Sequence, residues 1–188
     1  MLFDNDARAA FGVITDLLNT SAQRSGGSED LLEHSATIDQ IAVRNALSYK
    51  PEHSRAEEVE VRLLRSRLED FLRHPSVDAR IALVNSLLVS AGSTPQLAAH
   101  SGDERPHFHY TMDDATFSSK LTALTGIGLA RLLTTQGEDR FRICDGQDCE
   151  KTFIDVSKNA SRRYCDSQTC GNRLHAARYR ARRGEQSA

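Results

Sequence analysis

The residues best suited to chemistry are four cysteines, and all of them lie in the last quarter of the chain. Cys144 and Cys149 form one C-x4-C pair, and after fifteen further residues Cys165 and Cys170 form a second. Zinc in structural sites takes four soft ligands in tetrahedral geometry, commonly supplied as two close pairs. The spacing therefore predicts one structural Zn²⁺ bound by all four thiolates. Four protein ligands leave no open position, so catalytic zinc is not expected.

Two other uses of these cysteines stay open at this point, namely a redox pair and buried thiols without chemistry. The sequence contains no C-x-x-C motif, in which thiol pKa values are commonly lowered. No cysteine occurs before residue 144, so the clustering favours a metal site. Titration of thiols in the native protein separates a reactive sensor from saturated zinc ligands.

Basic residues gather around and after the second cysteine pair. From Lys158 to Arg183, eight basic residues accompany one acidic residue, a net +7, whereas residues 1–157 carry 16 basic and 24 acidic residues, a net -8. Guanidinium groups bind phosphates and guanine edges in bidentate geometry. We therefore predict nucleic-acid contacts from Lys158, Arg162, Arg163, Asn172, Arg173, Arg178, Arg180, Arg182 and Arg183. A solvated tail, or a tail docked on the acidic body, is the alternative.

The chain before the cysteines has helical patterning up to about residue 138. Apolar residues recur at helical spacing in four stretches, which are Phe11-Ile14-Leu18, Val61-Leu64-Leu68-Leu72, Val77-Ile81-Val84-Leu88 and Leu121-Leu124-Leu132. A fifth helix is expected within residues 31–47, with loops at 21–28 and 92–106 and a short strand at 107–110. Gly126 and Gly128 weaken the last helix, because glycine costs about 1 kcal/mol relative to alanine.

The cysteine region reads as a small hairpin followed by a helix. The hairpin is expected between the two pairs, where Phe153 and Val156 alternate and Asn159 marks a turn. Asn172 is expected to cap the following helix, which carries the arginines and His175. The predicted fold is mainly α, with a helical domain over residues 1–138. A small treble-clef-like zinc-binding module, made of a β-hairpin plus a helix and with four cysteine ligands, is expected over residues 139–184. Residues 185–188 are expected to be a tail.

The stretch "FIDVSKNASRRYCDSQTCGNR" resembles the CGNR zinc finger. The matching positions are Phe153, Asp155, Ser157, Asn159, Ser161, Arg162, Arg163, Cys165, Cys170, Gly171, Asn172 and Arg173. The departure is Tyr164, where the family usually has tryptophan, and an aromatic side chain is kept there. The resemblance implies a zinc-dependent module that reads nucleic acid.

The helical part is similar to the stress-induced transcription regulator (ABATE) domain that commonly precedes this finger. "TDLLNT" matches the signature of that domain through Asp16, Leu17, Asn19 and Thr20, and "VRNALSY" and "LVNSLL" match its later helices. Together the resemblances imply a bacterial transcription regulator. Because one small finger reads only about 3 base pairs, we expect a homodimer on double-stranded DNA, with a small-molecule effector as a further partner.

Other classes of function find little support in the sequence. There is no secretory signal or apolar run long enough for a membrane span, so we expect a cytoplasmic protein. No catalytic motif is present, and we expect no enzyme. His107 and His109 would form a metal pair only with further ligands. A protein- or RNA-binding adaptor without DNA sequence preference remains the alternative function.

Overall fold

Hydroxyl side chains begin the long helices of the computed structural model, which describes residues 5–98, 107–135 and 137–172. Ser54 caps α4 (Arg55–Arg73), Ser76 caps α5 (Val77–Ser90) and Thr116 caps α6 (Phe117–Thr134), each by accepting a backbone N–H three residues on. The other helices are α1 (Asn5–Leu18), α2 (Ala22–Ser25) and α3 (Ser35–Arg44), with a 3₁₀ turn η1 (Leu31–Glu33). We call α1 to α6 and the segments that join them the helical body.

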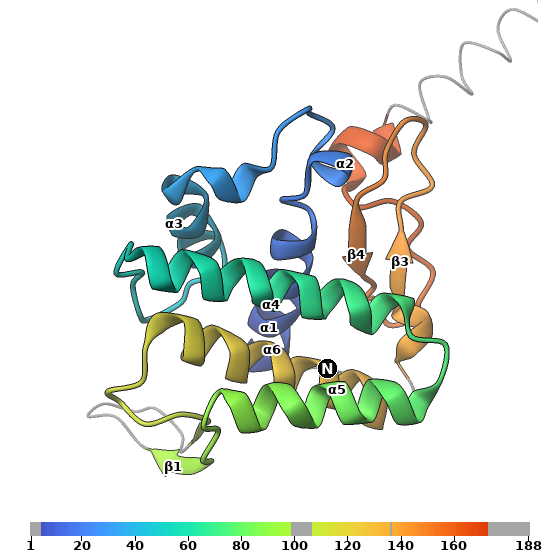
Figure 1. Ribbon diagram of the computed structural model, residues 1–188. Helices are drawn as coiled ribbons and strands as arrows, with labels where there is room; N and C mark the ends of the chain where they lie inside the picture. The colour runs from blue at the N-terminus through green and yellow to red at the C-terminus, as the bar shows by residue number, and fades with distance from the viewer. Residues whose placement is uncertain (1–4, 99–106, 136, 173–188) are drawn as a thin grey trace, which may run out of the picture.

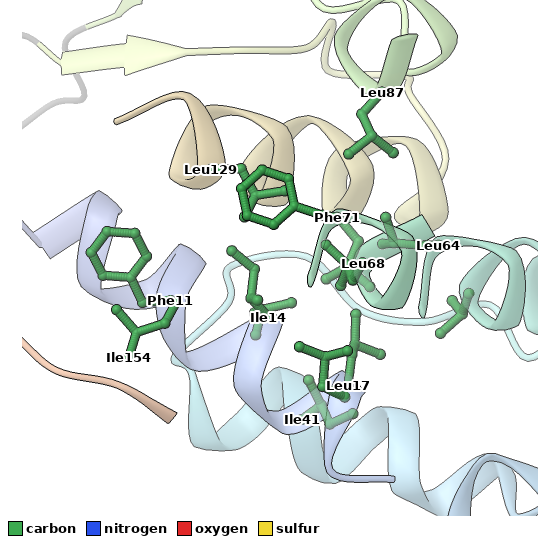
Figure 2. Packing of buried hydrophobic residues seen from close by; sticks show 14 of the residues in the cluster. Phe11, Ile14, Leu17, Ile41, Leu64, Leu68, Phe71, Leu87, Leu129 and Ile154 are labelled. Atoms are coloured by element: carbon green, nitrogen blue, oxygen red, sulfur yellow. The ribbon is translucent and has the colours of Figure 1, made fainter. Parts of the chain in front are cut away.

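The helices of the body pack against one another, as Figure 1 shows. They enclose one apolar core. Ile14, Leu17, Leu121 and Leu129 have no exposed surface, and α6 contacts α1, α4 and α5. Figure 2 shows side chains from these helices meeting in the centre. The predicted mainly helical fold is therefore confirmed, and the predicted loop at residues 21–28 contains the short helix α2.

Gly126 and Gly128 permit the close packing of α6. A Cβ on Gly126 would lie 2.9 Å from Leu88 Cδ2, and one on Gly128 would lie 2.6 Å from the Cβ of Ala10. The sequence marks these glycines as weak points of a helix. In the structure they let α5 and α1 approach α6 closely.

Two hairpins complete the part of the fold that the structure describes. β1 (Gln96–Ala98) pairs antiparallel with β2 (His107–His109), so a strand forms inside the stretch expected to be unstructured. β3 (Phe141–Ile143) pairs antiparallel with β4 (Thr152–Ile154) after a turn η2 (Glu138–Arg140). Residues 137–172, which end with the helical turn η3 (Ser167–Gly171), form what we call the cysteine module.

Candidate zinc centre and its junction with the helical body

The four cysteines converge on one point. Their Sγ atoms all lie within 4.8 Å of one another, and Cys165 Sγ lies 3.8 Å from the sulfurs of both Cys149 and Cys170. Four sulfurs at about 2.3 Å from a tetrahedral zinc would be separated by about 3.8 Å. The separations therefore fit a single Zn²⁺, and the cysteine module carries one structural zinc site, as the sequence predicts.

Cys144 is the most enclosed of the four ligands. It is 6% exposed, and its sulfur accepts hydrogen bonds from the backbone N–H of Cys165 (3.3 Å) and of Gly146 (3.4 Å). Burial works against the thiolate of Cys144, but these N–H groups, together with hydrogen bonds from the Cys165 and Cys149 side chains, outweigh burial and lower the pKa of the thiol. Burial raises the pKa of Cys149 and of Cys165, where crowded sulfurs add to the effect. A divalent cation would offset the repulsion between these closely spaced sulfurs when they are thiolates.

Gly146 explains how the first pair can turn so tightly. A Cβ at this position would lie 3.2 Å from Cys170 Sγ and 3.3 Å from Cys144 Sγ. Any larger residue would therefore push against two ligands at once. The signal was present in the sequence, as a glycine inside a C-x4-C loop, and its role becomes clear only with the second pair in place.

The hairpin lies elsewhere than the sequence analysis placed it. Its strands β3 and β4 flank the first cysteine pair, and the residues between Asp155 and Cys165 form a loop. Asp155 is fully buried, and its carboxylate accepts the backbone N–H groups of Ser157 (2.9 Å) and Arg162 (2.7 Å). Such side-chain bonds compete with strand pairing, which accounts for the error.

A helical turn, η3, begins before the start of the predicted helix. Backbone N–H of Thr169 donates to Asp166 Oδ1 at 2.7 Å, and the turn η3 starts at Ser167, so Asp166 and not Asn172 provides the cap. Cys170 consequently lies inside this turn. Two ligands from a loop beside a hairpin and two near a helical turn give the treble-clef-like arrangement that was expected.

The residues that were predicted to contact nucleic acid lie in different surroundings. Arg162 donates to the carbonyls of Tyr164 and Cys165, and its guanidinium lies 5.2 Å from the centre of the Phe153 ring. Arg163 pairs with Asp145 at 2.7 Å while its side chain stays 62% exposed. Lys158 and Asn172 are exposed. Arg173, Arg178, Arg180, Arg182, Arg183 and His175 lie outside the described residues.

Two arginines that the sequence analysis did not single out hold the loop in shape. Arg140 Nη1 donates to the carbonyls of Asp155 and Ser157, both at 2.8 Å. Arg142 donates to three carbonyls, including that of Ala160 at 2.8 Å. Arginine suits this task because it presents five donors in a fixed plane. Their alternation just before Cys144 was the only local signal.

The cysteine module joins the helical body along β4. Asn19, just after α1, donates from Nδ2 to the carbonyl of Thr152 (2.9 Å) and accepts the backbone N–H of Thr152 at Oδ1 (2.8 Å). The amide thus takes the place of a neighbouring strand. Ile154, 5% exposed, belongs to the same apolar core as Phe11 (Figure 2). The helical body and the cysteine module therefore share one core.

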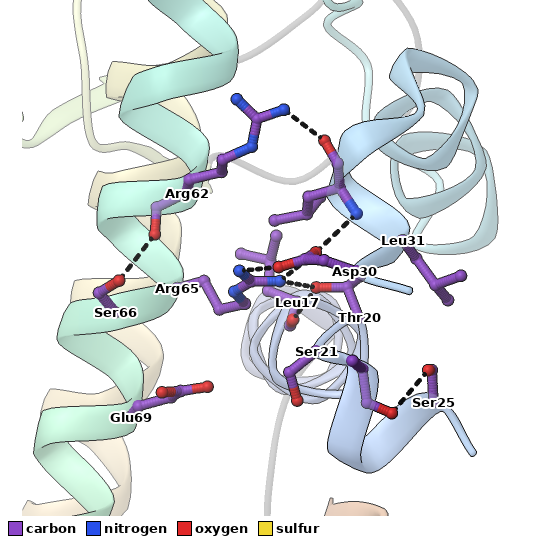
Figure 3. A network of polar contacts seen from close by, with 12 residues as sticks. Leu17, Thr20, Ser21, Ser25, Asp30, Leu31, Arg62, Arg65, Ser66 and Glu69 are labelled. Atoms are coloured by element: carbon purple, nitrogen blue, oxygen red, sulfur yellow. Dashed lines mark hydrogen bonds and ion pairs between the residues drawn. The ribbon is translucent and has the colours of Figure 1, made fainter. Parts of the chain in front are cut away.

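The neighbours of Asn19 in the "TDLLNT" stretch connect α1 to other helices. Asp16 accepts from Arg44 (3.0 Å) and from the Asn45 amide (2.9 Å), both near the end of α3. Thr20 accepts from Arg65 of α4 at 2.9 Å, and Arg65 also binds Asp30 (Figure 3). This short stretch thus holds α3, α4 and β4 around α1.

A cleft of about 1110 Å³ lies at this junction. Its walls come from α1, α2 and α3 on one side and from the cysteine module on the other, including Cys149, Cys165 and Cys170. His107 and His109, which would bind a metal only with further ligands, lie on β2. Among the described residues, the cysteines are the one converging set of three or more metal ligands.

Comparisons with known proteins agree with this architecture. Residues 12–136 match the family model described as "Putative stress-induced transcription regulator" (ABATE), and residues 140–183 match the CGNR zinc finger. Comparison with curated proteins gives no match. No helix in the described part of the chain is long and apolar enough to cross a membrane. The chain belongs to the ABATE family and carries a C-terminal CGNR zinc finger.

Proposed function

We propose that this protein is a zinc-dependent transcription regulator that binds double-stranded DNA. The observation that carries the proposal is the convergence of the four cysteines directly ahead of the basic residues 173–183. The match to a regulator family supports it. A bound Zn²⁺ would cross-link the cysteine module, and an enzymatic role is not part of the proposal.

The proposed DNA contacts fall into two groups. Arg163 and Lys158 are exposed in the cysteine module and would bind phosphates, since arginine and lysine contribute most of the salt-sensitive affinity for DNA. Asn172, Arg173, Arg178, Arg180, Arg182 and Arg183 would approach the duplex from the segment after Cys170. Arg162 is committed to carbonyls within the module, so its contribution to DNA binding would be through the shape of the loop.

We further propose the division of labour that the sequence suggested. Residues 1–138 would serve dimerisation or effector sensing, residues 139–184 would bind DNA, and residues 185–188 would be a tail. A homodimer would give a two-fold symmetric target, because a single module covers too few base pairs for useful specificity. A regulator of this kind would act in the cytoplasm, where the bacterial chromosome lies.

Binding of the purified full-length protein to two duplexes across a salt series tests the proposal. One duplex comes from upstream of its own gene and the other has random sequence, and zinc content is measured in parallel. We expect one zinc per chain and a preference for the upstream duplex that survives rising salt. Equal, steeply salt-dependent binding to both would instead support a nucleic-acid adaptor, and no binding would direct the search to protein partners.

Substitutions separate base contacts from phosphate contacts. Arg173→Ala is expected to cost about 1–3 kcal/mol on the preferred duplex and to relax its sequence preference. Lys158→Ala is expected to weaken binding to both duplexes alike and to reduce the salt slope by about 1. Lys50→Ala, which removes an exposed lysine between α3 and α4, is the matched control and should leave binding unchanged.

A further inference from the structure

A second hollow, of about 380 Å³, lies in the helical body. It is enclosed by the first half of α4, the end of α5 and the beginning of α6. Leu63, Leu64 and Ala91 line it and provide an apolar surface, and Leu63 is 51% exposed. The volume lies within the range of small-molecule sites in proteins.

Glu57 is the unusual residue of this pocket. It is only 5% exposed, and its Oε2 accepts the backbone N–H groups of Glu52 (2.8 Å) and His53 (3.1 Å). These two bonds fix the carboxylate in place. Oε1 is buried and has no hydrogen-bond partner among the described residues. Because an unpaired buried acceptor is costly, this oxygen calls for a donor from outside the chain.

The other groups that line the pocket indicate the charge of that donor. Glu52 and Glu60 add two acidic side chains, whereas Arg67 is the one basic residue among those lining the pocket and donates to Ser90 Oγ at 3.1 Å. Hydroxyl groups of Thr116 and Ser118 lie 3.1 Å apart on the α6 side. The lining is therefore net acidic and rich in acceptors, which favours a cation over an anion.

We propose that this pocket binds a small organic ammonium ion. The N–H groups of the ligand would donate to Glu57 Oε1, and its alkyl part would lie against Leu63, Leu64 and Ala91. An ammonium group suits the position because it offers several donors and a positive charge, whereas an alcohol offers one donor without charge. Binding of the ammonium ion to this pocket does not depend on the proposed function. Only a regulatory role for the ion rests on the proposed function.

NMR titration of the full-length zinc-loaded protein at pH 7 tests this proposal. The probes are n-butylammonium chloride, n-butanol and sodium butyrate. We expect saturable shifts of amide signals around the pocket with butylammonium, at least tenfold weaker binding of butanol, and none of butyrate. This comparison needs no variant. Equal binding of butanol and butylammonium, or no saturable shift, would overturn the proposal and leave a water molecule as the partner of Oε1.

Glu57→Gln gives the sharpest second test. The glutamine oxygen can keep accepting from Glu52 and His53, while an amide NH₂ replaces the unpaired oxygen and the charge is lost. We expect butylammonium binding to weaken at least tenfold. Glu58→Gln, on the same helix but outside the pocket, is the control and should bind as the wild type does. Undiminished binding to a folded Glu57→Gln variant would contradict the proposal.

Discussion

In the helical body, the buried side chains are almost all apolar, whereas the cysteine module is held largely by sulfur and by backbone carbonyls. Leu17, Leu121 and Leu129 are fully buried in the body. In the cysteine module, Arg140 and Arg142 collect carbonyl groups around the loop, and Asp155 collects N–H groups. A segment this small buries too little apolar surface to order itself, so polar bonds and a metal take over.

The two regions meet at β4, where both kinds of stabilisation act on neighbouring residues. Thr152 is bound through its backbone by Asn19, and Ile154 is buried in the apolar core. The cysteine module therefore needs the helical body for part of its order. The helical body, in contrast, has a core that is nearly complete without the module. Damage should therefore spread from body to module more readily than the reverse.

Removal of a zinc ligand is expected to have the largest effect, and this effect should be confined to the cysteine module. Cys149→Ser should release the metal and disorder the loop around the cysteines, because structural zinc contributes on the order of 10 kcal/mol to folding of small modules. The helices of the body should remain. Zinc analysis and far-UV circular dichroism measure the two parts, and complete loss of helical signal would show that the body depends on the metal.

A cavity in the core tests the opposite direction. Leu129→Ala is expected to lower the free energy of unfolding by about 2–5 kcal/mol, because Leu129 is fully buried between helices. Urea unfolding gives the value. Because the cysteine module depends on the helical body, zinc should be released together with the loss of helical signal, and zinc that stays bound after the helices have unfolded would contradict this dependence.

The junction itself is tested at Asn19. Asn19→Leu leaves both the N–H and the carbonyl of Thr152 without their partner, and we expect a loss of about 1–3 kcal/mol. Hydrogen exchange at the amide of Thr152 should quicken. Asn19→Asp keeps the acceptor and loses the donor, so its exchange rate should fall between those of the wild type and Asn19→Leu. Unchanged exchange in both variants would argue that Ile154 alone fixes β4.

The smallest expected effect is the change in stability that Asp30 causes at low pH. The hydrogen bond from Arg65 outweighs partial burial and holds the pKa of Asp30 below its usual value. A lowered folded-state pKa stabilises the native state above the unfolded pKa, and this contribution is lost as the pH falls through the folded value. The stability difference between wild type and Asp30→Asn should therefore shrink from pH 6 towards pH 2. Thermal unfolding at each pH measures this stability difference. A difference that stays constant with pH would contradict the lowered pKa of Asp30.

Much of this architecture could be predicted because its signals are local. The cysteine spacing indicates the metal site, and apolar periodicity indicates the long helices. Contacts between distant segments could not be found in this way. Asn19 and Thr152 are 133 positions apart, and nothing near either residue marks the other. The cap was misplaced at Asn172 because Asp166, earlier in the chain, is an equally good capping residue.

The bond between Asn19 and Thr152 has a consequence for synthesis of the chain on the ribosome. α1 emerges first, but the strand that covers Phe11 and satisfies Asn19 follows 133 residues later. At about 5–20 residues per second, the wait lasts roughly 7–27 s. During that time an apolar strip of α1 and the side-chain amide of Asn19 are open to chaperones and to other nascent chains. The last quarter of the chain is therefore also the part that ends this exposure.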